Sequence, residues 1–114
     1  MPILLVEDDQ DLAALWREYL ISKGLPTEVR HTVAEARKAI SELELDLLIV
    51  DYTLPDGTAE DVLAAVRASG TAAKVILCSG HGYDLPDAVL DQVYVLAKPF
   101  RLDALEAAIR ALRP

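Results

Sequence analysis

The chain has 114 residues, 53% of them hydrophobic, and its 19 acidic and 11 basic residues give a formal net charge of −8 at pH 7. This length suits a single domain over residues 1–114, and the scattered basic residues disfavour direct nucleic-acid binding, which needs clustered Lys and Arg. Because no apolar run approaches the length of a membrane span and acidic residues 7–9 break the N-terminal apolar stretch, we expect a cytoplasmic protein with neither signal peptide nor membrane insertion.

The first part of the chain predicts alternating strands and helices. Residues 3–6 form an apolar run typical of a buried strand. The helix expected next has apolar side chains three and four residues apart, namely Leu12, Leu15, Trp16, Tyr19 and Leu20. Asp8 or Asp9 is its expected cap, and Gly24 ends it. Residues 27–30 predict a short strand, and Thr32-Val-Ala-Glu35 is a capping-box pattern that opens a second helix.

The second part continues the alternation. The apolar run 47–50 ends at Asp51 and is followed by the breaker string Tyr52-Thr-Leu-Pro-Asp-Gly57, which is typical of a strand buried on both faces. A third helix is expected over about residues 59–68, a fourth strand over 74–78 with a buried Cys78 thiol, and a last strand and helix over 93–97 and 102–112. Glycines and a proline interrupt residues 80–92, so we expect a short or irregular helix there.

This pattern predicts an α/β fold, a five-stranded parallel doubly wound (βα)5 sheet with helices on both faces. Open sheets of this kind bind ligands beyond the carboxyl ends of their strands. Three strands lead there into polar residues: the first into Glu7-Asp8-Asp9, the third into Asp51, and the last into Lys98-Pro99. A cluster of acids with a lysine suits a magnesium ion and a phosphoryl group.

Each of these residues also has a plain structural interpretation. The acidic run is compatible with a helix N-terminus, where the helix dipole favours acids, and Asp51 with a turn residue. Lys98 needs an anionic partner, which a structural ion pair with Asp51 would supply, and the Lys98-Pro99 bond is a candidate for a cis peptide. Asp51 is equally suited to act as a nucleophile towards phosphorus and form an aspartyl phosphate.

Four segments together resemble the receiver domain of bacterial two-component response regulators: residues 3–9, 48–57, 75–80 and 97–100. The resemblance covers essentially the whole chain and implies the flavodoxin-like strand order 2-1-3-4-5. It implies phosphorelay signal transduction, in which Asp51 accepts a phosphoryl group from a histidine kinase or histidine phosphotransfer protein in a Mg2+-dependent reaction. It also implies that the signal passes to a downstream protein partner, and that the domain is not an enzyme, with at most slow autodephosphorylation.

The resemblance also assigns site residues. Asp51 is the phosphorylation site, and four groups bind the metal: the side chains of Glu7, Asp8 and Asp51 and the backbone carbonyl of Thr53. Ser79 is the switch hydroxyl and Lys98 the phosphate-binding lysine. Asp9 lies one position beyond the acidic pair and is better interpreted as a helix cap.

Two features depart from the family pattern. Val95 occupies the position of the usual aromatic switch residue, and Tyr94 beside it is expected on the opposite face of the strand. The fourth helix is also short, as in single-domain regulators and receivers attached to hybrid kinases. Val95, Thr53 and His81, which lies two residues after Ser79, are therefore candidate modulators of the phosphoryl group.

Two other functions fit parts of the pattern. Asp51-Tyr-Thr53 partly resembles the Asp-x-Thr motif of aspartyl-phosphate-forming phosphohydrolases, but Leu54-Pro55 replaces the Gly-Thr pair that continues that motif. A degenerate receiver that acts only as a binding module is the other alternative. The complete set of acids, hydroxyl and lysine argues against it.

Overall fold

A five-stranded parallel sheet forms the centre of the computed structural model, which describes residues 1–80 and 87–113. Its strands are β1 (Ile3–Val6), β2 (Thr27–Arg30), β3 (Leu47–Asp51), β6 (Lys74–Ser79) and β7 (Val93–Ala97), in the spatial order β2-β1-β3-β6-β7. Counted along the chain, this is the predicted order 2-1-3-4-5. Two further short strands, β4 (Thr53–Leu54) and β5 (Gly57–Thr58), form a small antiparallel hairpin that the sequence did not predict.

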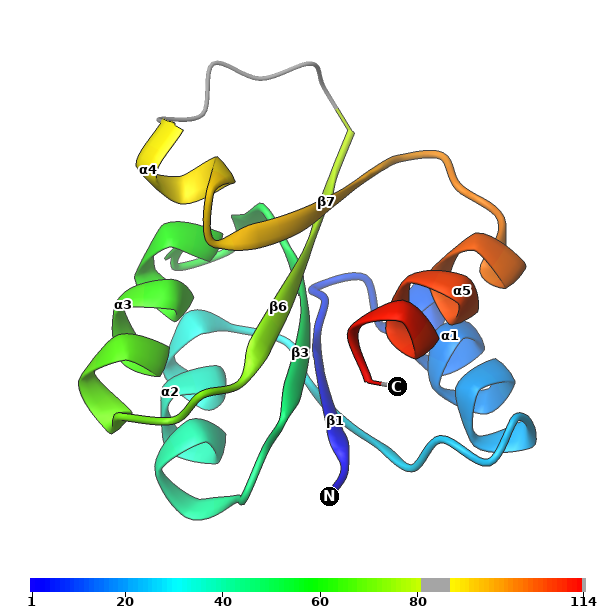
Figure 1. The fold of residues 1–114 in the computed structure, drawn as a ribbon, viewed down its shortest axis with the longest axis horizontal. Coiled ribbons are helices and arrows are strands. Elements are labelled where there is room, and N and C mark those ends of the chain that lie inside the picture. The colour runs from blue at the N-terminus through cyan, green and yellow to red at the C-terminus, as the bar shows by residue number, and fades with distance from the viewer. Residues whose placement is uncertain (81–86, 114) are drawn as a thin grey trace.

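Helices cover both faces of the sheet, as expected for a doubly wound fold. The helices α1 (Gln10–Ser22) and α5 (Leu102–Leu112) lie on one side, and α2 (Val33–Glu42) and α3 (Ala59–Ser69) on the other (Figure 1). The remaining helix, α4 (Asp87–Leu90), has four residues and lies beside β7 (Figure 1). Within the described ranges, no helix is long and apolar enough to cross a membrane.

The sheet is buried between two apolar layers because β1 is apolar throughout and β3 is apolar at every position before its last residue, Asp51. In β1 and β3, alternate side chains point to opposite faces. Leu4 and Val50 pack with α2 and α3, whereas Leu5 and Ile49 pack with α1 and α5. The sequence prediction of a strand buried on both faces is therefore confirmed for β1 and β3. Leu15 fits the apolar spacing of α1 but is 54% exposed.

Side-chain caps fix where the first three long helices begin. Asp9 accepts a hydrogen bond from the Leu12 backbone N–H (3.1 Å), so Asp9, rather than Asp8, caps α1. Thr32 accepts one from Glu35 N–H (3.1 Å) at the start of α2. The Asp9 side chain therefore caps α1, whereas the Asp8 side chain belongs to the acidic cluster at the end of β1.

The short fourth helix agrees with the prediction for the chain after β6. Residues 81–86, including His81, lie outside the described residues, so the role expected for His81 stays a prediction. Tyr94 and Val95 in β7 are 44% and 42% exposed. The edge strand β7 is thus much less buried than β1 or β3.

Gly57 lies where a side chain would collide with the start of α3. The Thr58 side chain and the Asp61 carboxylate form a capping box there, and a Cβ built on Gly57 would overlap Asp61 Oδ2. Gly57→Ala should therefore lower the free energy of unfolding by about 1–3 kcal/mol, the usual effect of overpacking. Urea unfolding would measure this. Gly80→Ala is the control, since a Cβ there meets nothing within 4 Å among the described residues. An equal loss of stability in both variants would contradict the argument.

Candidate functional site

Four parallel strands end at the same edge of the sheet and bring the predicted residues together. Glu7 directly follows β1, Asp51 is the last residue of β3, Ser79 the last of β6, and Lys98 directly follows β7. The register pairs Asp51 with Cys78 and Ser79 with Ala97, so neighbouring strands end almost level. The Lys98 backbone N–H also donates to the Ser79 carbonyl (2.7 Å). The Lys98-Pro99 bond is cis, as the sequence suggested.

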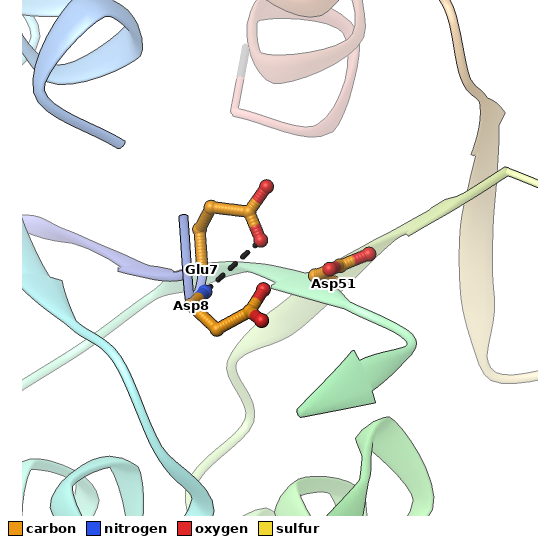
Figure 2. Close-up of side chains that lie close together, drawn as sticks. All are labelled: Glu7, Asp8 and Asp51. Carbon is orange, nitrogen blue, oxygen red and sulfur yellow. Dashed lines mark hydrogen bonds between the residues drawn. The ribbon is translucent and has the colours of Figure 1, made fainter. Parts of the chain in front are cut away.

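Three carboxylates form an acidic cluster at this edge. One carboxylate oxygen from each of Glu7, Asp8 and Asp51 lies within 4.8 Å of the others. Figure 2 shows the first two residues at the end of β1 and Asp51 beside them at the end of β3, with the Asp8 N–H donating to Glu7 Oε2 (3.1 Å). The Asp51 side chain is 14% exposed, so a reagent can reach it. Oxygen ligands of this kind match the preference of Mg2+.

Lys98 is the cation that the structure places against these acids. Its Nζ lies 3.2 Å from Asp51 Oδ1, which is the predicted ion pair, and 3.0 Å from Glu7 Oε1, which the sequence analysis did not anticipate. Glu7 is 1% exposed, so a buried carboxylate is paired directly with the lysine. The Lys98 ammonium is paired with two of the three carboxylates, so the cluster carries an excess of negative charge when all three acids are ionised, and a divalent cation would balance it.

The protonation of Glu7 reflects this imbalance. Burial, together with the hydrogen bond and negative charge of Asp51, raises the pKa of Glu7 from 4.5 to about 7, although Lys98 opposes the shift. Burial lowers the pKa of Lys98, but its bonds to Glu7 and Asp51 outweigh that effect and raise it overall. Lys98 therefore stays charged at neutral pH, while Glu7 lies close to its titration midpoint.

The loop after Asp51 is held against the neighbouring helix. Asp56 accepts hydrogen bonds from the backbone N–H groups of Val33 (2.7 Å) and Ala34 (3.0 Å) at the start of α2. These bonds lower the pKa of the Asp56 carboxyl. In the sequence, Asp56 appears only as part of the turn after Asp51. A single sequence does not show which distant helix N-terminus a loop carboxylate will bind.

The other predicted residues lie at different depths around the acidic cluster. Thr53 begins β4 and has an exposed side chain, next to the loop that Asp56 holds. Ser79 is 3% exposed at the end of β6. Val95 pairs with Leu77 in the middle of β7, one strand further from Asp51. The structure therefore places Thr53 and Ser79 at the same edge as Asp51, and Val95 away from it.

His31 is a neighbour of the acidic cluster that sequence reasoning missed. It follows β2, and its Nδ1 lies 2.8 Å from the Glu7 backbone carbonyl oxygen. A carbonyl oxygen only accepts, so Nδ1 carries the proton and donates. This bond ties the end of β1 to the loop before α2. A signal was present in the sequence, since His31 directly follows the second strand at the same edge of the sheet.

Comparison with known proteins identifies the class that this fold and site define. The family model of the response regulator receiver domain matches residues 3–110. The chain therefore belongs to the response regulator receiver domain family, and the resemblance seen in the sequence is confirmed. This is a signalling domain of two-component systems, and its acidic pocket is of the kind that binds Mg2+ in receiver domains.

Particular relatives agree with this assignment. The regulatory protein LuxO of Vibrio vulnificus is 37% identical over 78 residues, which is 68% of this chain and 17% of LuxO. The response regulator PmrA of Pseudomonas aeruginosa is 35% identical, with 98% of this chain and 52% of PmrA covered. The transcriptional regulator CpxR of Escherichia coli is 34% identical, with 96% and 48% covered. The chain thus spans about half or less of these relatives.

Solved structures show the same fold. The signal receiver domain of the LuxO repressor of Vibrio parahaemolyticus superposes with a TM-score of 0.88 at 29% identity, covering 97% of this chain and 88% of that one. A CheY-like receiver domain from Methylobacillus flagellatus gives a TM-score of 0.88 at 25% identity, covering 98% of both chains. These matches favour a receiver over the phosphohydrolase that Asp51-Tyr-Thr53 partly resembles.

Proposed function

We propose that Asp51 accepts a phosphoryl group from a phosphohistidine of a histidine kinase or histidine phosphotransfer protein, and that the aspartyl phosphate changes contacts with a downstream protein. The observation that carries this proposal is the position of Asp51. Its carboxylate is partly exposed at the end of the central strand β3, beside two further carboxylates and 3.2 Å from the Lys98 ammonium.

The chemistry proposed is a direct displacement at phosphorus. An Asp51 oxygen forms the new O–P bond while the N–P bond of the phosphohistidine breaks, and the electron pair leaves with the imidazole. Bound Mg2+ supplies charge neutralisation for the phosphoryl oxygens. The residues proposed to hold it are Glu7, Asp8 and Asp51, with the Thr53 carbonyl.

The remaining site residues would act on the product. Lys98, already paired with Asp51, would bind a phosphoryl oxygen, and the Ser79 hydroxyl at the end of β6 would bind another. The phosphoryl group carries about −1.5 to −2 charge and replaces the single negative charge of the Asp51 carboxylate, so the cluster becomes more negative. The proposed output to the partner is a rearrangement of the chain after Ser79, an expectation that falls largely on residues 81–86 and so lies outside the described residues. Water would remove the phosphoryl group slowly, so the domain works as a switch.

A phosphoramidate, which contains the same N–P bond as phosphohistidine, tests this function without a cognate kinase. With Mg2+ the intact mass of the protein should increase by one phosphoryl group, and with EDTA it should stay unchanged. Asp51→Asn keeps the size of the side chain and removes the nucleophile, so this variant should gain no mass. Phosphoryl transfer that is equally fast in Asp51→Asn or in EDTA would contradict the proposal.

A further inference from the structure

The ammonium of Lys98 has a third neighbour besides the two acids. Its Nζ lies 5.4 Å from the centre of the Trp16 ring, over the face of the indole. A lysine ammonium within about 6 Å of an indole face is attracted by the negative charge of the π system. Trp16 belongs to α1, and the sequence pattern explained it as a core residue. Its side chain is indeed buried, with 6% exposure, but it also contacts the functional lysine.

The indole ring is held firmly in place. It packs in the apolar layer between the sheet and helices α1 and α5, with Leu20, Leu105 and Ile109 in the same cluster. The Phe100 ring lies against it, with centroids 5.1 Å apart and planes inclined by 42°. Phe100 follows Lys98 by two residues, so the loop that carries the lysine is anchored on the same indole. The ring is therefore a fixed support and not a mobile surface side chain.

Together these contacts give the ammonium three neighbours: Glu7 at 3.0 Å, Asp51 at 3.2 Å and the indole face. A lysine has a flexible four-carbon stem and loses much rotamer freedom when its ammonium is fixed. We propose that Trp16 is a positioning residue for phosphoryl transfer, whose indole keeps Lys98 directed at Asp51 before the phosphoryl group arrives. This inference rests on the proposed function of Asp51.

The consequence is a faster reaction. Charge-stabilising groups accelerate a reaction most when they already point to where the charge develops. As the O–P bond to Asp51 forms and the N–P bond of the donor breaks, negative charge develops on the phosphoryl oxygens. The Lys98 ammonium is then already in position to stabilise it. Without the indole, Lys98 keeps its two acidic partners, but its side chain has more conformational freedom. Trp16 itself touches neither the phosphoryl group nor the metal ligands in this scheme.

The rate of phosphorylation by a phosphoramidate with Mg2+ tests the effect. Trp16→Leu should slow the reaction by about three- to tenfold, which is the range expected for a partly desolvated cation–π contact. Trp16→Phe retains an aromatic face and should recover most of the rate. Leu105→Ala is the matched control, because it opens a cavity in the same apolar cluster and leaves the indole in place. A Trp16→Leu rate equal to that of Leu105→Ala would overturn the proposal.

A second measurement needs no variant that risks misfolding. In the wild-type protein, the ring current of the indole should move the Lys98 ε-methylene proton signals upfield of an ordinary lysine. Signals at the ordinary position would overturn the proposed contact. If the wild type takes up no phosphoryl group, the proposed function of Asp51 fails, while the ring-current shift still decides whether Trp16 holds Lys98. If phosphorylation proceeds but is insensitive to Trp16, only the positioning role fails.

Discussion

Replacing Asp8 with asparagine should lower the affinity for Mg2+ by about tenfold or more. Substitutions around metal sites commonly weaken metal binding by this amount. The Asp8 carboxylate lies in the cluster with Glu7 and Asp51, and its charge is one of the three that attract the ion. Titration calorimetry with magnesium chloride at constant ionic strength would measure the change. Constant ionic strength matters because salt screens the other surface charges.

Asp9 supplies the matched control for this prediction. Its carboxylate accepts a hydrogen bond from Leu12 N–H (3.1 Å) and caps α1. Asp9→Ala should therefore reduce the free energy of unfolding by about 1 kcal/mol while Mg2+ affinity stays close to that of the wild type. The opposite result, with metal binding lost in Asp9→Ala and kept in Asp8→Asn, would show that the assigned metal ligand is one residue out of register.

The metal-free protein should become less stable as the pH rises from about 5 to about 7.5. The pKa of Glu7 is raised from 4.5 to about 7, chiefly by burial, so between these values the folded state binds a proton that the unfolded state has released. Because the unfolded state binds fewer protons there, the free energy of unfolding falls with pH, by up to about 3 kcal/mol for a shift of this size. Metal ligands must be deprotonated, so Mg2+ should stabilise the protein more at the higher pH.

Urea unfolding followed by circular dichroism in EDTA, at both pH values, would measure this loss. Glu7→Gln is the control because a glutamine does not titrate, and its stability should change much less over the same pH range. If Glu7→Gln lost as much stability as the wild type, another group would be responsible for the pH dependence.

The sequence predicted the fold well where its signals were local. The apolar run before Asp51 defines β3, the spacing of apolar residues defines α1, and the Thr32-Val-Ala-Glu35 pattern marks the start of α2. These features depend on side chains within a few residues of each other, so a single sequence contains them. The parallel order then brings the strand ends to one edge, which explains why Asp51 and Lys98 were expected to meet.

The contacts that were missed join parts of the chain that are far apart. The Glu7–Lys98 ion pair, the bonds from Asp56 to the start of α2 and the Trp16–Lys98 contact each depend on the packed geometry of several elements. The hydrophobic pattern places Trp16 in the core but does not show which functional group will lie against its ring. Leu15 shows the same limit, since it matched the apolar spacing of α1 and is nevertheless exposed.

The identity of the phosphorylated residue is the most direct test of the account. Borohydride reduces an acyl phosphate to an alcohol, so an aspartyl phosphate is converted to homoserine, which tandem mass spectrometry locates in a peptide. After treatment with a phosphoramidate and Mg2+, we expect homoserine at position 51 alone. Homoserine at position 8 or 9, or spread over several acids, would contradict the assignment of Asp51 as the phosphoacceptor.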